Sequence, residues 1–373
     1  MSAGRARIPV TRPYLPSFER YRKYLEGAYE RCWLTNNGPL VQALTRRLEE
    51  RLGVSNLLLV ANGTLALQIA FRALDVKRAA VTSPFTFVAT ASALHWEGIT
   101  PRFADVDRAT LDLDPAAAER AITPEVSAIV PVHVYGAPCE VEAIDAVARR
   151  HSLKVIYDAA HAFAVDYGGS SVLRWGDAAT LSLHATKLFH TGEGGAIVFK
   201  DRDAFERAGR MINFGIDVSD GSIVDPGINA KLSELHAAMG LAMLDDLDQI
   251  LERRRAIADL YARSLDGAVE TQAWPAAATR NGAYVPILMK DEPQCLRLKA
   301  QLESEGVEPR RYFHPPLARV PLYDHGAETP IADSASRRVL CLPVFHELQD
   351  ADILAICETV RRVAGENAAP GRV

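Results

Sequence analysis

Short apolar runs alternate with longer amphipathic segments over most of the chain. In residues 40–52, the side chains of Leu40, Leu44, Leu48 and Leu52 recur at the spacing that places them on one face of a helix. The apolar runs between such segments are short and are bounded by glycine, proline or polar residues, which is typical of buried strands. The pattern therefore predicts strands and helices in alternation.

The predicted strands are residues 57–60, 79–82, 101–105, 128–134, 155–157, 178–183 and 196–199. The predicted helices of the same region are residues 18–29, 40–52, 65–74, 85–96, 115–122 and 141–151. Strands of this length that alternate with helices indicate an α/β fold, with a parallel or mostly parallel sheet covered by helices on both faces.

The second half of the chain predicts a long helix and a smaller α/β unit. Apolar residues in 231–255 favour one continuous helix that joins two domains. We expect residues 1–245 to form an N-terminal arm and a large domain, and residues 246–373 to form a smaller domain. The predicted elements of the smaller domain are a strand at 285–289, a helix at 295–305, a loop or edge strand at 310–316, a helix at 350–363 and a disordered tail at 365–373.

Composition narrows the functional classes. The chain has 373 residues, 48% of them hydrophobic, and a formal net charge of −5, with no basic stripe interleaved with aromatic residues. We therefore expect no nucleic-acid partner. No apolar run approaches the roughly 20 residues of a membrane span. Arg5 and Arg7 are not followed by an apolar segment, so we expect no signal peptide. The five cysteines form no C-x-x-C pair, which predicts reduced thiols in a cytoplasmic protein and no metal site.

Several polar or aromatic residues lie near the ends of predicted strands. They are Gly63, Thr64, Phe87, His133, Asp158 and Ser182. In sheets of this type, ligands bind beyond the carboxyl ends of the strands, so we expect these residues to gather at one edge. The turn at Gly63 and Thr64 opens a helix and could direct free backbone N–H groups at an anion, although many helices begin this way.

Lys187 lies between two predicted strands and is followed by a glycine-rich segment. Burial disfavours the ammonium form, and a neutral amine attacks aldehydes, so Lys187 is a candidate Schiff-base residue. Alone it would more simply be a surface lysine, and Asp158 alone could be a helix cap. Pyridoxal phosphate (PLP) needs a lysine, phosphate donors at a helix start, a carboxylate for its ring nitrogen and an apolar cover. Lys187, the turn at 63–64, Asp158 and Phe87 supply this set.

The chain resembles the PLP-dependent nucleotide-sugar aminotransferases of the DegT/DnrJ/StrS family. The motifs that carry this resemblance are residues 61–67, 84–90, 158–162, 182–196 and 227–233, and their order and spacing hold over roughly residues 8–365. The resemblance implies the fold-type I architecture of PLP-dependent transferases. It also implies transamination, because dehydratases of this family replace the lysine with histidine, whereas Lys187 is present here.

The resemblance also implies roles for single residues. Lys187 would form the Schiff base and move protons, and Asp158 would pair with the ring nitrogen. Phe87 would stack on the ring, and His161 would lie near the ring hydroxyl, where many members have glutamine.

The phosphate group would be bound from two subunits. Gly63, Thr64 and Ser182 would bind the phosphate within one subunit, and Asn229 would reach the phosphate of its neighbour. The expected assembly is therefore a homodimer with shared active sites.

Within the family, residues 33–40, 131–136 and 155–163 are similar to those of members that act on a dTDP-linked sugar. The implied reaction transfers the amino group of L-glutamate to the C4 keto group of dTDP-4-keto-6-deoxyglucose. The products would be dTDP-4-amino-4,6-dideoxyglucose and 2-oxoglutarate. This similarity favours a ligand contact for Asn36 and Asn37, which could otherwise form only a turn between helices.

Other assignments remain open at this point. Arg310, Arg311, Tyr312 and His314 could bind the diphosphate of a nucleotide sugar, or could form a solvated basic loop. The substrate could be a different nucleotide ketosugar, with another nucleotide or with the keto group at C3. A PLP-binding regulator without catalytic activity is an alternative from a different class, although no DNA-binding helix pair is appended to the chain.

Overall fold

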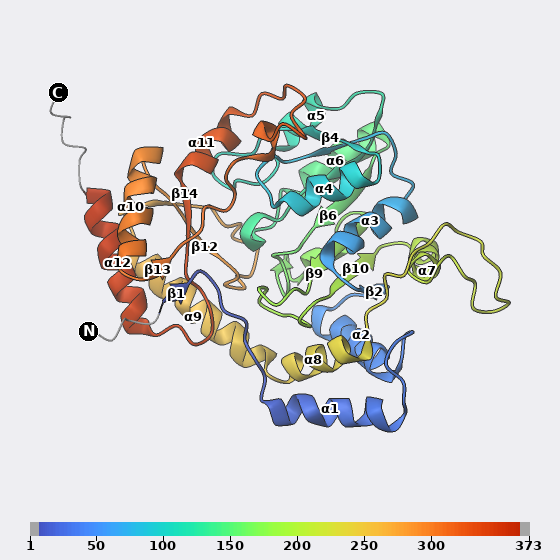
Figure 1. The fold of residues 1–373 in the computed structure, drawn as a ribbon. Helices are drawn as coiled ribbons and strands as arrows, with labels where there is room; N and C mark the ends of the chain where they lie inside the picture. The colour runs from blue at the N-terminus through green and yellow to red at the C-terminus, as the bar shows by residue number, and fades with distance from the viewer. Residues whose placement is uncertain (1–6, 366–373) are drawn as a thin grey trace.

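A seven-stranded sheet forms the centre of the larger part of the protein (Figure 1). The computed structural model describes residues 7–365. In spatial order the strands are β2 (Leu57–Val60), β10 (Gly195–Phe199), β9 (Ala178–Ser182), β6 (Lys154–Asp158), β5 (Val126–Val130), β3 (Ala79–Thr82) and β4 (Thr100–Phe103). All neighbours pair in parallel except β10, which is antiparallel to β2 and β9. The predicted mostly parallel α/β sheet is confirmed.

The strands carry apolar residues on both faces, which explains why helices pack on both faces of the sheet. In β6, Val155 and Tyr157 pack into one core while Ile156 packs into the other, as the two-residue period of a strand requires. The first face is covered by α2 (Pro39–Leu52), α5 (Pro115–Arg120), α6 (Val141–His151) and α8 (Glu234–Asp245). The second face is covered by α3 (Gly63–Ala73), α4 (Val88–Trp96) and α7 (Arg202–Met211).

The strand predicted at 128–134 is partly wrong. Strand β5 ends at Val130, and Val134–Gly136 forms a 3-10 turn instead. The buried carboxylate of Asp112 accepts a hydrogen bond from the Val134 backbone N–H at 2.8 Å, and Tyr135 adopts a positive φ of 57°. The hydrogen bond to Asp112, 22 positions earlier, and the positive φ of Tyr135 turn the chain away from the sheet, so the strand ends although the apolar run continues.

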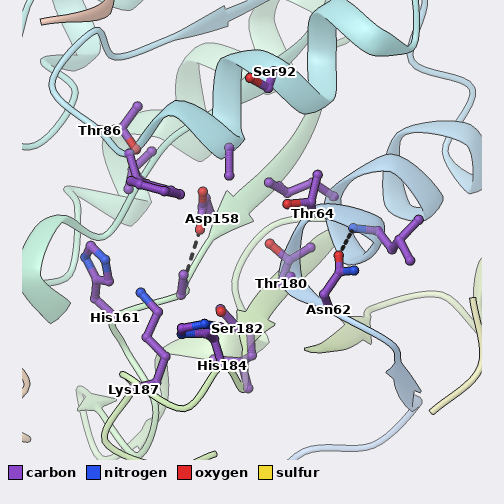
Figure 2. Close-up of a pocket in the computed structure, with 18 of the residues that line it drawn as sticks. Asn62, Thr64, Thr86, Ser92, Asp158, His161, Thr180, Ser182, His184 and Lys187 are labelled. Carbon is purple, nitrogen blue, oxygen red and sulfur yellow. Dashed lines mark hydrogen bonds between the residues drawn. The ribbon is translucent and has the colours of Figure 1, made fainter. Parts of the chain in front are cut away.

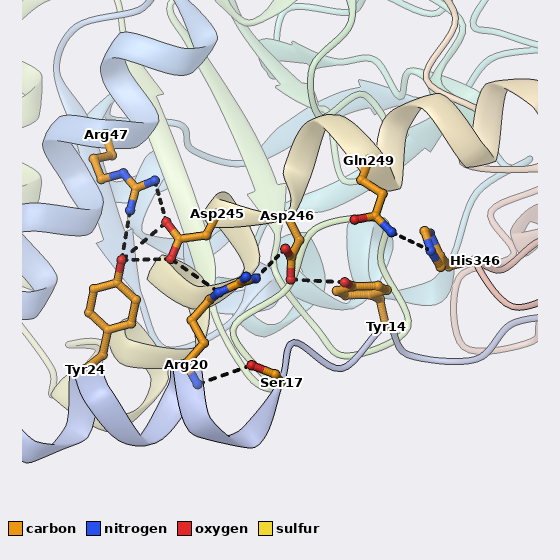
Figure 3. Close-up of polar contacts among 9 residues, drawn as sticks. All are labelled: Tyr14, Ser17, Arg20, Tyr24, Arg47, Asp245, Asp246, Gln249 and His346. Carbon is orange, nitrogen blue, oxygen red and sulfur yellow. Dashed lines mark hydrogen bonds and ion pairs between the residues drawn. The ribbon is translucent and has the colours of Figure 1, made fainter.

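The single helix predicted at 231–255 is also wrong, because α8 ends at Asp245 and α9 (Leu247–Leu265) begins after a break at Asp246. Both carboxylates are engaged by the N-terminal segment (Figure 3). Arg20 forms ion pairs with both, and the Tyr14 hydroxyl donates to Asp246 at 3.0 Å. Residues from a distant part of the chain therefore stabilise a bend that the local helical pattern does not reveal.

The C-terminal part has a core of its own. Strands β11 (Glu270–Thr271), β12 (Val285–Leu288) and β14 (Val339–Leu342) form an antiparallel sheet, packed with α9, α10 (Glu292–Ser304) and α12 (Asp350–Gly365). Helix α11 (Pro330–Arg338) and the preceding loop, which contains Tyr312 and Phe313, pack between this antiparallel sheet and the larger part of the protein. The proposed domain boundary at residue 245 falls at the break between α8 and α9. The predicted disordered tail lies, beyond Gly365, outside the described residues.

The N-terminal arm crosses from the C-terminal part to the large sheet. Strand β1 (Ile8–Pro9) pairs in parallel with β13 (Val307–Glu308), and the Val10 carbonyl accepts from the backbone N–H of Val344. The Tyr14 ring then packs edge-on against His346, at 4.9 Å between ring centroids. Helix α1 (Phe18–Glu30) continues along α8 (Figure 1).

The remaining short pair, β7 (Asp166–Tyr167) and β8 (Ser170–Ser171), is a hairpin outside both main sheets. Within residues 7–365, no helix combines the length and the apolar character needed to cross a bilayer. All five cysteines are unpaired, and Cys32 is the exposed one.

The bend at Asp246 gives a first testable prediction. Asp246→Ala removes the Arg20 ion pair and the acceptor of Tyr14, so it should lower the free energy of unfolding by about 1–2 kcal/mol. Glu26→Ala is the matched control, because its ion pair with Arg22 is solvent-exposed and should contribute less than about 0.5 kcal/mol. Urea titrations followed by circular dichroism measure both. Equal effects would contradict a structural role for the bend.

Candidate active site

A cavity of about 970 Å³ opens at the carboxyl edge of the large sheet. Figure 2 shows side chains from α3, from the α4 region, from the end of β6 and from the segment after β9 directed towards it. The cavity-lining residues that were candidates in the sequence are Gly63, Thr64, Phe87, Asp158, His161, Ser182, Lys187 and Tyr312. Residues separated by as many as 249 positions therefore meet in one space, counted from Gly63 to Tyr312 (312 − 63).

Lys187 lies on a tight loop between β9 and β10. The backbone N–H groups of Leu183 and Ala185 donate to the carbonyls of Gly194 and Gly192, and the Lys187 N–H donates to His184. These bonds fix the path of the loop and leave the Lys187 side chain in the cavity. Burial lowers the pKa of Lys187 to about 8, while the charge of Asp158 opposes that shift. A minor fraction of neutral amine, about one tenth at pH 7, is therefore present near neutral pH.

His190 ties the same loop to the N-terminal arm. Its Nδ1 accepts from the Gly192 N–H at 3.2 Å, so the neutral ring carries its proton on Nε2. Nε2 then donates to the Tyr14 carbonyl oxygen at 2.7 Å. Because His190 is buried, desolvation lowers its pKa, which favours the neutral ring.

Asp158 ends β6 and is buried at the base of the cavity. Burial raises its pKa, and hydrogen bonds from Thr90 and from the Ala160 backbone N–H, together with the charge of Lys187, oppose that rise. Oδ2 accepts from Thr90 at 2.7 Å and Oδ1 accepts from Ala160 at 3.2 Å. The carboxylate is thus held in one orientation, facing a cavity that also contains an amine.

His161 is held as a neutral donor. Its Nδ1 accepts from the Tyr135 backbone N–H at 3.1 Å, which places the ring proton on Nε2. Burial, followed by the charge of Lys187, lowers the pKa of His161 well below its usual value. Tyr284 packs against the ring at 4.5 Å between centroids, so the imidazole has little freedom to rotate.

The start of α3 supplies an anion-binding surface. The Asn62 side chain caps the helix by accepting from the Leu65 N–H at 2.9 Å. The N–H groups of Gly63 and Thr64 in the first turn have no acceptor within the helix, and the Ser182 side chain lies directly beside Gly63. A Cβ atom at Gly195 would lie 2.5 Å from the Asn62 carbonyl, so glycine is needed where β10 passes the helix start.

Aromatic side chains from both parts of the chain flank the cavity. Phe87, at the start of α4, is 56% exposed, and Tyr284, Tyr312 and Phe313 approach from the C-terminal part. The Tyr135 hydroxyl donates to the Tyr312 carbonyl oxygen, and Phe313 packs against Phe85 in the core between the two parts. The C-terminal part is therefore needed to complete the cavity walls.

Other candidates from the sequence lie elsewhere in the single chain. Asn36 and Asn37 adopt positive φ angles and line a separate cavity beside Lys231, and Asn229 is exposed. His314 is outside the main cavity and contacts Arg311 and Ser336.

The two arginines and His133 also lie apart from the cavity. Arg311 is bound to Glu292 and to backbone carbonyls, and Arg310 lies at the strand edge beside Cys341. His133 is fully buried and stacks on Tyr157. The expectation that His133 joins the others at the ligand-binding edge is wrong, because the 3-10 turn after β5 carries it inside.

Three functional contacts are not evident from the sequence. Thr90 and Asn62 lie within the motifs 84–90 and 61–67, but the resemblance assigns a role to neither. Their contacts with Asp158 and with the Leu65 N–H are evident only in the fold. Tyr284 precedes a predicted strand of the other domain, so only the docking of the two parts reveals its position. A capping pattern of Asn62 with the following helix is the one available signal.

The cavity fits PLP on three independent observations. Lys187, an amine of lowered pKa, shares the cavity with the buried carboxyl group of Asp158. The start of α3 has free N–H groups and lies next to Ser182. Gly195 has no Cβ atom that would displace the start of α3. Lys187 would hold the aldehyde carbon, and the helix start with Ser182 would hold the phosphate. Asp158 would lie against the ring nitrogen.

Residues 18–361 match the DegT/DnrJ/EryC1/StrS aminotransferase family. The chain belongs to this family. It is therefore a PLP-dependent sugar aminotransferase with the fold-type I architecture. The family resemblance stated from the sequence motifs is confirmed.

Two relatives in the family carry the same name, dTDP-4-amino-4,6-dideoxy-D-glucose transaminase. The chain is 39% identical to the protein from Escherichia coli, covering 94% of this chain and 96% of the relative. It is 41% identical to the protein from Shigella dysenteriae, covering 95% and 99%.

A solved structure of DesI in the presence of its TDP-sugar product is similar to this fold. Its TM-score is 0.92 at 34% identity, with 98% of this chain and 94% of that chain covered. DesV from S. venezuelae, in complex with a ketimine intermediate, has a TM-score of 0.87 at 26% identity, with 97% and 100% covered.

The reactivity of Lys187 can be measured directly. Reductive trapping of a small aldehyde at Lys187, quantified by peptide mass spectrometry across pH, should show a midpoint near 8. Asp158→Asn removes the charge that supports the ammonium form, so the midpoint should fall. An exposed lysine, Lys77, serves as the internal reference in the same digest. A midpoint unchanged by Asp158→Asn would contradict the proximity of the two groups.

The helix start can be tested with paired glycine substitutions. Gly195→Ala should lower the free energy of unfolding by about 1–3 kcal/mol and weaken PLP binding, because the new methyl group displaces Asn62 and Gly63. Gly209→Ala is the control, since a Cβ atom there would meet no other atom within 4 Å, and should be neutral or stabilise α7 by about 0.5–1 kcal/mol. Urea unfolding and fluorescence titration with PLP measure the two effects.

Proposed function

We propose that this aminotransferase moves the amino group of L-glutamate to the C4 keto group of dTDP-4-keto-6-deoxyglucose. The reaction would yield dTDP-4-amino-4,6-dideoxyglucose and 2-oxoglutarate, a step of deoxysugar biosynthesis. The presence of Lys187 and Asp158 in one cavity is the observation that supports transamination as the reaction type. The choice of sugar is supported by the two relatives at 39% and 41% identity, and by DesI, whose structure contains a TDP-sugar product.

PLP, when bound, supplies an aldehyde for the amines and a cationic ring that withdraws electrons from the reacting carbon. Lys187 Nζ acts as the base that accepts a proton from the glutamate α-carbon and later returns one to the sugar carbon. A pKa near 8 suits both directions, because the neutral amine that accepts a proton and the ammonium form that returns one are both populated near neutral pH. Asp158, held ionised, keeps a proton on the ring nitrogen.

The remaining residues orient the reacting groups. His161 offers its Nε2 proton to the ring hydroxyl, since Nδ1 is committed to Tyr135. The first turn of α3 and Ser182 bind the phosphate, and Phe87 covers one face of the ring. Tyr284 and Tyr312 face the space left for the sugar, where their aromatic rings exclude water.

A homodimer would complete the site. Asn229 follows a loop whose apolar side chains Phe214, Val218, Ile223 and Val224 are exposed in the single chain. Exposed apolar side chains of this kind mark a contact surface. In such a dimer Asn229, and the turn at Asn36 and Asn37, would serve the neighbouring subunit. Arg310 and His314 remain candidates for the nucleotide end of the substrate.

Lys187→Ala tests the proposed function most directly. The variant should bind PLP but lose at least about a thousandfold of the turnover with L-glutamate and dTDP-4-keto-6-deoxyglucose, because no base remains at the reacting carbon. Chromatographic detection of the amino sugar and of 2-oxoglutarate measures this. Lys77→Ala is the control, because it changes an exposed lysine just before β3, at the end of that strand remote from the cavity.

The same assay separates the substrate alternatives. Wild-type protein should prefer the dTDP-linked 4-ketosugar over a GDP-linked 4-ketosugar and over a dTDP-linked 3-ketosugar. A GDP-linked substrate is a meaningful competitor, because GDP-perosamine synthase from Escherichia coli O157:H7 is 30% identical over 95% of this chain. A higher kcat/KM with either competitor would overturn the proposed substrate, and no turnover with any of them would overturn the enzymatic assignment.

A further inference from the structure

A buried pair of threonines lies behind the carboxylate of Asp158. Thr90, in the first turn of α4, is completely buried, and its hydroxyl donates to Asp158 Oδ2 at 2.7 Å. The hydroxyls of Thr86 and Thr90 lie 3.0 Å apart, within hydrogen-bond distance. Thr86 lines the cavity, whereas Thr90 approaches the carboxylate from the side of α4, outside the cavity lining.

The direction of the hydrogen bonds follows from the chemistry of the groups. An ionised carboxylate can only accept hydrogen bonds, so the Thr90 hydroxyl must donate to Asp158. The Thr90 oxygen is then free to accept, and Thr86 supplies the donor. The result is a short chain of donors from Thr86 through Thr90 to Asp158 Oδ2, while the Ala160 N–H holds Oδ1.

We propose that Thr90 is a positioning residue for the aminotransferase reaction, which holds Asp158 ionised and aimed at the ring nitrogen of the cofactor, with Thr86 as its outer support. This inference rests on the proposed function of Asp158. A hydrogen bond from a hydroxyl to a carboxylate is stronger than one between neutral groups, and this one forms without bulk water. Because Thr90 is fixed in a helix, the carboxylate cannot rotate without losing its donor.

The hydrogen bond from Thr90 stabilises the ionised form of Asp158. Loss of the hydroxyl would leave a buried charge with one donor fewer, and the carboxyl group would then retain its proton at higher pH. A protonated carboxyl group cannot keep a proton on the ring nitrogen, and the electron-withdrawing power of the ring would fall. Lys187 and Tyr284 interact electrostatically with Asp158, and His161 lines the same cavity. None of the three changes in the variants below.

Three single variants separate this role from simple packing. Thr90→Val removes the hydroxyl at nearly constant volume, and Thr90→Ser restores it. Thr82→Val is the matched control, because Thr82 is also completely buried but donates to the Val130 carbonyl at 2.7 Å, away from Asp158.

The first measurement is spectroscopic, on the PLP-loaded protein. A protonated ring nitrogen lowers the pKa of the Schiff-base nitrogen, so the pH midpoint of the absorbance change should rise in Thr90→Val. It should stay at the wild-type value in Thr90→Ser and Thr82→Val. The single-turnover rate with L-glutamate should fall about tenfold in Thr90→Val alone. A midpoint that is equal in Thr90→Val and Thr82→Val would overturn the proposal.

The second measurement uses the protein without PLP, so that it is independent of the catalytic assignment. Thr90→Val should reduce the free energy of unfolding more at pH 8 than at pH 5, because stability linked to a raised carboxyl pKa is lost as pH rises through it. Thr82→Val should reduce it equally at both pH values. Adding Asp158→Ala should abolish the pH dependence of the Thr90→Val effect, and its persistence would show that Thr90 does not act on Asp158.

Failure of this inference differs from failure of the proposed function. If wild-type protein aminates no ketosugar, the proposed function is wrong, yet the unfolding data still decide whether Thr90 supports the charge of Asp158. If turnover occurs but Thr90→Val behaves like Thr82→Val in both measurements, only the role of Thr90 is wrong.

Discussion

The proposed active site depends on whether the buried carboxyl group of Asp158 can ionise. Burial favours the neutral acid, and three contributions oppose this: the Thr90 hydroxyl, the Ala160 N–H and the charge of Lys187. Each contribution comes from a different segment of the chain. The Ala160 N–H is close in sequence, whereas Thr90 and Lys187 reach Asp158 because β3, β6 and β9 end at the same edge of the sheet.

Much of this architecture is predictable from local pattern. The alternation of apolar and polar positions locates β2, β3 and α6 to the residue, and the placement of Asp158 and Lys187 after strands indicates one shared edge. Short-range physics dominates these features, because a strand buried on both faces leaves an uninterrupted apolar run and a helix leaves a stripe. Comparison with relatives confirmed the family, whereas the roles of the individual site residues stay predictions.

The features that local pattern misses depend on contacts distant in sequence. The helix break at Asp246 is stabilised by Arg20, more than two hundred residues earlier by subtraction (246 − 20), and helical periodicity cannot detect it. Thr90 reaches Asp158 only because α4 follows β3, two positions from β6 in the sheet. Tyr284 enters the cavity through the docking of the C-terminal part, which no local pattern encodes.

The arm that precedes α1 connects the chain's start to its reactive centre through a single imidazole. The Tyr14 carbonyl oxygen accepts a hydrogen bond from His190, three residues beyond Lys187. The Tyr14 ring packs against His346, and its hydroxyl donates to Asp246. Shortening the chain past this tyrosine would therefore loosen the lysine loop without deleting one cavity-lining residue. Purification tags and fusion partners are better attached at the other terminus, after α12, because that helix packs within the C-terminal core, away from the lysine loop.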